Sequence, residues 1–207
     1  PLLAGDAESF LRRVAPRVVG QLVDALLDPG EPESVQLRIA ALLTELEDPR
    51  SMAGLLAASG RGPFDLRCVA ARAAARRLAR TGSAVGDSAA VYTLVRRELS
   101  VDETTWQGRG PMAAPRTASD RSVLLHGRVL EGVRRSLEHV FTLLALVHRR
   151  EVMASVLAGL VSGDRDLHGT ALEYLESVLP SEVRAALWPR LGHSATPSNL
   201  VMCLGGA

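Results

Sequence analysis

The sequence of 207 residues contains no lysine, and all 24 of its basic residues are arginines. We interpret this as the coding bias of a GC-rich genome and not as a functional signal. Aromatic residues make up only 3% of the chain, and the alternation of β-branched or aromatic residues that is typical of strands is missing. Leu, Ala, Val and Arg dominate instead, and most of these residues are good helix formers. The composition therefore predicts an all-α fold.

The low net charge, the short apolar runs and the small number of cysteines indicate where the chain is located and what it binds. The net charge is only +1, so no whole-molecule field draws the chain to nucleic acid or anionic lipid. The longest apolar run, 140–147, is shorter than the roughly 20 residues that cross a bilayer. Cys68 and Cys203 lie far apart without metal-ligand spacing, which favours a reducing compartment and leaves one disulfide as the alternative. We expect a cytoplasmic chain which, starting at Pro1 without a signal peptide, could be a piece of a larger protein.

Apolar residues recur at helical spacing along most of the chain, and proline and glycine turns separate these segments. The predicted helices are 8–27 with a break at Pro16, 34–46, 50–59, 65–80, 86–99, 119–148, 150–162, 166–179 and 181–191, so we expect roughly nine or ten helices. Residues 100–118 show no periodicity, and a loop of that length is usually functional or disordered. The tail 192–207 is expected to fray. We predict one continuous domain, with repeats over 1–99 and 119–191 on either side of the loop.

Three of the predicted helical segments share one template. They begin at Ser34, Asp65 and Asp166, at offsets of 31 and 101 residues, and the second offset is close to three repeats of about 34 residues. Each begins with a capping residue and an apolar residue, and each carries a small or apolar residue at its sixth and tenth positions. The sixth positions are Ile39, Ala70 and Ala171, and the tenth are Leu43, Ala74 and Leu175. Such a period is typical of helical pairs that bury their apolar faces only by stacking into a solenoid.

The segment from Asp65 resembles the HEAT-repeat (armadillo-like) family, in which Asp, an aliphatic residue, Arg, two spacers and Ala open the second helix of each pair. The matching residues are Asp65, Leu66, Arg67 and Ala70. The copy from Asp166 has His168 where Arg is usual, and the copy from Ser34 lacks the Asp. The resemblance covers roughly 16–99 and 120–191, and it implies a right-handed α-solenoid of HEAT-like helical pairs.

A second resemblance concerns the run 137–191, which includes the motif ALEYL…LP from Ala171. This run is similar to the HEAT region that follows the membrane domain of certain bacterial proteins, themselves similar to ATP/ADP translocases or other major-facilitator transporters. In those proteins the repeats lie in the cytoplasm as an interaction or regulatory module. The resemblance implies that this chain is a non-catalytic scaffold with a protein partner, and that it belongs to a larger transporter-like membrane protein.

Charge is unevenly distributed along the sequence. Residues 1–48 carry four arginines against nine acidic residues, whereas 49–86 carry seven arginines against one acidic residue. Three arginines at i,i+4 spacing share one face of the helix 65–80: Arg72, Arg76 and Arg80. Because arginine binds phosphate and carboxylate through two parallel hydrogen bonds, this face is a candidate anion site. The competing hypothesis is that water solvates it or that the preceding acidic residues neutralise it: Glu45, Glu47 and Asp48.

Trp106 lies among glycines in the predicted loop, where an aromatic side chain can anchor a protein partner or can fold back over the helices. We assign Trp188, beside Pro189, to packing. The five histidines form no HExxH motif and no grid with cysteine, and the sequence contains no P-loop, nucleophile elbow or dinucleotide fingerprint. We therefore predict no metal, no cofactor and no catalytic residues.

Two alternatives to the scaffold stay open. HEAT scaffolds also carry enzymes such as alkylpurine DNA glycosylases, which would need a basic and aromatic concave surface with a buried carboxylate. Only 49–86 is basic here, and its one aromatic residue is Phe64. The second alternative is an anion- or nucleotide-sensing module that uses the arginine face. The preferred hypothesis is a non-catalytic solenoid that presents a groove or an end face to a protein.

Overall fold

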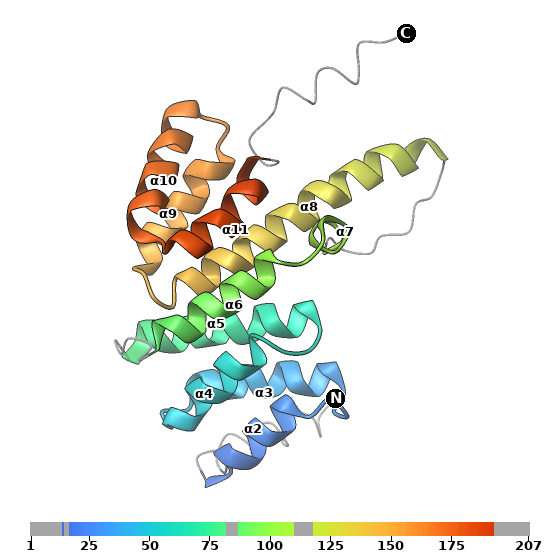
Figure 1. Ribbon diagram of the computed structural model, residues 1–207. Coiled ribbons are helices and arrows are strands. Elements are labelled where there is room, and N and C mark those ends of the chain that lie inside the picture. The colour runs from blue at the N-terminus through green and yellow to red at the C-terminus, as the bar shows by residue number, and fades with distance from the viewer. Residues whose placement is uncertain (1–13, 15–16, 82–86, 110–117, 193–207) are drawn as a thin grey trace. The chain divides into compact units, whose positions relative to one another are not determined.

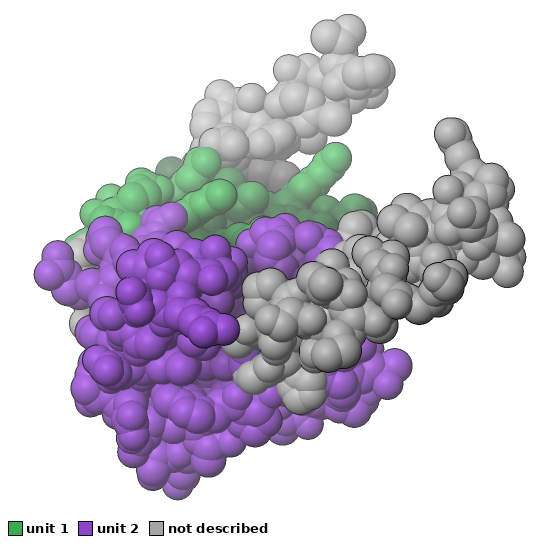
Figure 2. Space-filling view, turned by 90° about the horizontal axis from the view of Figure 1, so that it is seen from above, with its two compact units in different colours: residues 1–87 green, residues 88–207 purple. Residues whose placement is uncertain are grey.

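The computed structural model of the protein describes residues 14, 17–81, 87–109 and 118–192 (Figure 1). Every regular element in these residues is a helix, and there are ten of them, which confirms the all-α prediction. The helices group into two compact units, unit 1 over residues 1–87 and unit 2 over residues 88–207 (Figure 2). The helix predicted at 86–99 therefore belongs to unit 2, whereas the sequence had placed it with the N-terminal repeats.

Unit 1 contains four described helices that pack in chain order. They are α2 (Val19–Leu27), α3 (Glu33–Glu45), α4 (Pro49–Ala58) and α5 (Phe64–Thr81). Helix α2 packs on α3 and α4, α3 packs on α4 and α5, and α4 packs on α5. The first and last of these helices, α2 and α5, share no extended contact among the described residues. Each helix of unit 1 thus leans on its next two neighbours, and the four do not close into a ring.

The helix caps in unit 1 agree only in part with the caps predicted from the sequence. Asp48 caps α4 as an acceptor for the Arg50 backbone N–H at 2.8 Å, and proline occupies the first turn, where no N–H is required. Ser34, the predicted cap of α3, lies inside that helix, which begins after Pro32 without a side-chain cap. Asp65, the predicted cap of α5, lies in its first turn. These shifts of one or two residues leave the helices themselves in place.

Unit 2 contains one short and five longer helices. They are α6 (Ser88–Leu99), α7 (Glu103–Gln107), α8 (Ala118–Leu144), α9 (Arg150–Val161), α10 (Arg165–Val178) and α11 (Ser181–Gly192). Helix α8 packs on α6, α7 and α9, and α9 packs on α10. Helix α11 returns to the first helix of the unit and packs on α6. The packing order of unit 2 therefore differs from that of unit 1.

Helix α7 lies inside the stretch that we predicted as a loop. Asp102 caps it as an acceptor for the Thr105 backbone N–H at 2.8 Å and the Thr105 hydroxyl at 2.7 Å. A helix of five residues is too short to show a period in the sequence, and this is why the prediction missed it. Residues 110–117 of the predicted loop and most of the predicted tail lie outside the described residues.

The shared template predicts burial at two of its positions. At the sixth position, Ile39 is 9% exposed, Ala70 0% and Ala171 5%. At the tenth position, Leu43, Ala74 and Leu175 are each 0% exposed. The second position does not follow this pattern. Leu66 is 2% exposed there, but Val35 and Leu167 are 38% and 53% exposed. The small or apolar residues at the sixth and tenth positions therefore do lie in the interior, whereas the apolar residue at the second position is buried in only one of the three copies.

Candidate functional site

The three arginines of the predicted anion site have different surroundings. Arg72 and Arg76 are exposed on α5. Arg80, one turn further on, donates a hydrogen bond from Nη1 to the Thr44 carbonyl at 3.2 Å. That carbonyl belongs to the last turn of α3, where unpaired carbonyl groups carry partial negative charge and favour a cation. Arg80 therefore caps a neighbouring helix, while Arg72 and Arg76 lie on the surface.

A polar hollow of about 360 Å³ lies beside Arg80. Its lining residues come from the end of α3 and the end of α5: Thr44, Glu45, Glu47, Arg77, Arg80 and Thr81. Arg77 is 6% exposed and donates to the Asp48 carbonyl at 3.1 Å. Two carboxylates, of Glu45 and Glu47, thus line the hollow together with the guanidinium groups of Arg77 and Arg80.

Trp106 lies in the interior of unit 2. Its side chain is 1% exposed, so the structure shows the second of the two predicted alternatives, in which the indole folds back onto the helices. Two guanidinium carbons lie within cation–π distance of the centre of its ring, that of Arg109 at 5.7 Å and that of Arg190 at 4.8 Å. In this arrangement Trp106 is not accessible as a surface anchor, because its side chain is buried against the rest of the unit.

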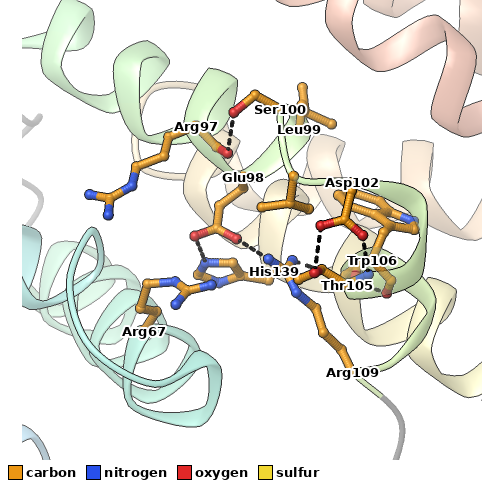
Figure 3. A network of polar contacts seen from close by, with 12 residues as sticks. Arg67, Arg97, Glu98, Leu99, Ser100, Asp102, Thr105, Trp106, Arg109 and His139 are labelled. Carbon is orange, nitrogen blue, oxygen red and sulfur yellow. Dashed lines mark hydrogen bonds and ion pairs between the residues drawn. The ribbon is translucent and has the colours of Figure 1, made fainter.

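A buried ionic network joins α6, α8 and the segment after α7 (Figure 3). Arg109 donates from Nη2 to a Glu98 carboxylate oxygen at 2.9 Å, and the two side chains are 4% and 3% exposed. The other oxygen of Glu98 lies 3.7 Å from Nε2 of His139, whose side chain is 0% exposed. In Figure 3 the carboxylate of Glu98 lies between the imidazole and the guanidinium group. Ser136 joins the network to α7, because its hydroxyl accepts from Nη1 of Arg109 at 3.4 Å and donates to the Trp106 carbonyl at 2.9 Å.

The network fixes the position of α7. Gly132 of α8 approaches α7 so closely that a Cβ atom on it would lie 1.8 Å from the Gln107 carbonyl oxygen. On α11, Arg190 donates to the Leu99 carbonyl at 3.1 Å and forms an ion pair with Glu103. These contacts connect α6, α7, α8 and α11. A carboxylate beside an imidazole is also the pair that general acid–base catalysis uses, but a substrate has no access to side chains this deeply buried.

Sequence reasoning missed this network. Glu98 is a charged residue beside the apolar stripe of its helix, whose buried members include Val95 and Leu99. His139 likewise lies between the buried residues Leu137 and Val140. A polar residue that interrupts an apolar stripe signals a buried partner, since a buried charge needs an opposite charge or hydrogen bonds. The pattern does not identify the partner, however, because Arg109 lies in a segment of the sequence without periodicity.

A second polar contact in unit 2 joins α6 to the turn between α8 and α9. The hydroxyl oxygen of Tyr92 lies 3.1 Å from Nε2 of His148. Burial lowers the pKa of His148 below its ordinary value of 6.5, because the charged imidazolium is the poorly solvated form. Burial also raises the pKa of the Tyr92 phenol. Both shifts favour the neutral pair, and the tautomer of the imidazole decides which of the two groups donates.

Unit 1 carries a largely apolar groove of about 460 Å³ between its helix connections. Its lining residues come from the α2–α3 turn, the α4–α5 turn and the adjoining helix ends: Leu26, Leu27, Pro29, Glu31, Glu33, Gln36, Ala58, Arg61, Gly62, Pro63 and Leu66. Gln36 is 6% exposed, and its Nε2 donates to the Leu26 carbonyl at 3.1 Å and the Asp28 carbonyl at 2.9 Å. This side chain ties α3 to the C-terminal end of α2 on one side of the groove.

The described residues hold no cluster of three or more His, Cys, Asp or Glu side chains that could bind a metal ion. Cys68 is buried and forms no disulfide. None of the helices that the structure describes combines the length and the apolar character that a membrane crossing requires.

These features define an all-helical protein of two compact units, with an open groove in unit 1 and a buried ionic network in unit 2. Comparison of the chain with protein-family models, with curated proteins and with solved structures finds no match. The resemblance to HEAT repeats therefore stays a prediction from the residues quoted above.

Proposed function

We propose that the chain is a non-catalytic protein-interaction module built as a HEAT-like α-solenoid. The packing order of unit 1 carries this proposal, because each helix leans on its next two neighbours while α2 and α5 share no extended contact in the described part of the chain. Helices stacked in this way expose a continuous surface along the stack and enclose no central site. The groove of unit 1 lies on that surface.

The buried sixth and tenth template positions also support the proposal. The alanines among them, Ala70, Ala74 and Ala171, let a helix approach its neighbour closely, as in a stack of helical pairs. Unit 2 supports the solenoid less, because α11 packs back on α6. The narrower proposal, that the chain is a cytoplasmic part of a larger transporter-like membrane protein, is supported by the resemblance of 137–191 alone.

The buried carboxylate of Glu98 does not favour the DNA glycosylase alternative. A base-excision site needs a carboxylate that a flipped nucleotide can reach. Glu98 is 3% exposed in its side chain and is paired with Arg109, which leaves no room for a base beside it. Trp106, whose ring lies beside the Arg109 guanidinium, is also buried.

The exposed positions of Arg72 and Arg76 favour one second candidate, an anion-binding module. It is weaker than the scaffold proposal because Arg80 is engaged with the end of α3. A thermal shift with millimolar phosphate or nucleotide that disappears in Arg76→Ala would support this candidate. An unchanged melting temperature would exclude it.

Titration with duplex DNA at two salt concentrations separates the scaffold from a DNA-binding enzyme. A scaffold with net charge +1 is expected to bind DNA weakly or not at all at both concentrations. Submicromolar binding that weakens steeply with salt would show that several arginines neutralise phosphates, and it would overturn the proposal.

A further inference from the structure

We infer that the groove of unit 1 binds an extended segment of a partner protein, with an apolar side chain inserted between the helices and a basic residue against Glu31 and Glu33. The inference rests on the proposed function and names the surface and the chemistry of the partner.

The apolar floor of the groove provides the first argument. Leu26, Ala58 and Leu66 contribute it, and these residues are 1%, 1% and 2% exposed, so the floor is fixed by the packing of unit 1. Pro29 and Pro63 line the groove at the two turns and stiffen its entrance. A volume of about 460 Å³ is in the range of ligand-binding clefts. The groove therefore accepts a large aliphatic side chain without rearrangement of the helices.

Charge at the rim selects the flanking residues of the partner. Glu31 belongs to the connection into α3, Glu33 is the first residue of α3, and Arg61 belongs to the connection into α5. Two carboxylates against one guanidinium group leave the rim acidic. An apolar residue with arginine or lysine beside it in the partner complements this rim, whereas an acidic segment is repelled.

Gln36 provides a hydrogen-bond acceptor on the wall of the groove. Its Nε2 donates to two backbone carbonyls, which identifies the nitrogen, since the amide oxygen cannot donate. The oxygen Oε1 lies in the same amide plane and points away from Nε2, and among the described residues it accepts no hydrogen bond. An extended peptide presents backbone N–H groups at regular spacing, and one of them satisfies Oε1.

The test is a titration of the ¹⁵N-labelled full chain, followed by NMR, with two peptides of equal apolar content. The basic probe is acetyl-Arg-Leu-Arg-Leu-Ala-amide, and the acidic probe is acetyl-Glu-Leu-Glu-Leu-Ala-amide. We expect the basic probe to shift the amide signals of Ala58, Gly62 and Leu66 and to bind about fivefold more tightly, as expected for one or two exposed ion pairs. Equal binding of both probes, shifts confined to other residues or no shift at millimolar peptide would overturn the inference.

Charge-reversal variants make the test specific to the groove. Glu33→Arg is expected to remove or invert the preference for the basic probe, and Glu31→Arg provides a second variant with the same expected result. The matched control is Glu47→Arg, because Glu47 is also an exposed carboxylate of unit 1 but does not line the groove. Circular dichroism checks that each variant stays folded. A preference that Glu47→Arg removes, or that both groove variants retain, would contradict the inference.

Failure of this inference can be told apart from failure of the proposed function. If a protein partner binds the full chain and Glu33→Arg does not weaken it, the groove is the wrong surface and the scaffold proposal stands. If the chain binds DNA with a steep salt dependence and no protein, both are wrong.

Discussion

Replacement of Glu98 by alanine tests whether the buried network of unit 2 holds α7 in place. The change removes the carboxylate partner from the Arg109 guanidinium, whose side chain is 4% exposed and lies 2.9 Å from Glu98. A guanidinium group at this depth cannot recover its lost interaction from water. Removal of one partner of a buried ion pair costs about 3–5 kcal/mol. In a domain of about 100 residues, each kcal/mol lowers the melting temperature by about 4–8 °C.

The assay is urea unfolding followed by tryptophan fluorescence. The chain has two tryptophans, Trp106 and Trp188, and both belong to unit 2, so the signal reports the unfolding of that unit alone. The control is Glu131→Ala, which removes a carboxylate of similar type from a pair with Arg134 at side-chain exposures of 32% and 53%. We expect the control to cost about 0–1 kcal/mol because exposed pairs are solvated and screened.

A double variant separates loss of the ion pair from loss of packing. Glu98→Leu combined with Arg109→Met replaces the pair by apolar side chains and should recover most of the stability that Glu98→Ala loses. If the free energy of unfolding of Glu98→Ala lies within about 1 kcal/mol of that of the unaltered chain, the ion pair does not stabilise unit 2 and does not hold α7 in place. If the double variant is as unstable as Glu98→Ala, packing and not charge is responsible.

Three further predictions use the same fluorescence signal. Burial lowers the pKa of His148 in the folded chain below 6.5, so just below that pH the unfolded chain binds more protons than the folded chain. The free energy of unfolding therefore falls as the pH drops through this window. His148→Gln should reduce this fall, which a series of urea midpoints from about pH 7.5 to 5 measures. Gly132→Ala should lower the free energy of unfolding by about 3 kcal/mol or more, because its Cβ would lie 1.8 Å from a carbonyl oxygen of α7. Gly169→Ala, whose Cβ would have nothing within 4 Å, should raise the free energy of unfolding by about 0.5–1 kcal/mol. Equal effects of the two changes would contradict the close approach of α8 to α7. Leu175 is 0% exposed, and Leu175→Ala should lower the free energy of unfolding by about 2–5 kcal/mol. Leu167 is 53% exposed, and Leu167→Ala should lower it by less than about 0.5 kcal/mol. The reverse order would show that the template is aligned wrongly.

Periodicity and turn chemistry were enough to predict the longer helices. Apolar residues at helical spacing mark the buried face of a helix, and proline or glycine marks its ends, so α4, α6, α9 and α11 begin and end within about two residues of their predicted bounds. The caps were harder, because several residues near a helix start can accept the same backbone N–H groups. Asp166, the predicted cap of α10, thus lies in its first turn, and Asp164 accepts its N–H instead, at 2.9 Å.

The polar interior of unit 2 could not be predicted from the sequence. Glu98 and Arg109 are separated by a turn and a short helix without periodicity, and their pairing depends on how that segment folds over α8. The same folding turns Trp106 inward, which the sequence left open. The arginine face shows a related limit, because helical spacing places Arg72, Arg76 and Arg80 together but says nothing of the carbonyl of α3 that Arg80 reaches.

In-cell photo-crosslinking tests the central claim most directly. A benzophenone amino acid placed at Arg61, an exposed residue on the groove of unit 1, would be activated in cells that naturally express the chain, with Arg150 of unit 2 as an exposed control position. The account predicts one discrete adduct with a protein at position 61 that is absent or weaker at position 150. Adducts with nucleic acid alone, or no adduct at any exposed position tested in either unit, would contradict the claim that the chain is a protein-interaction module.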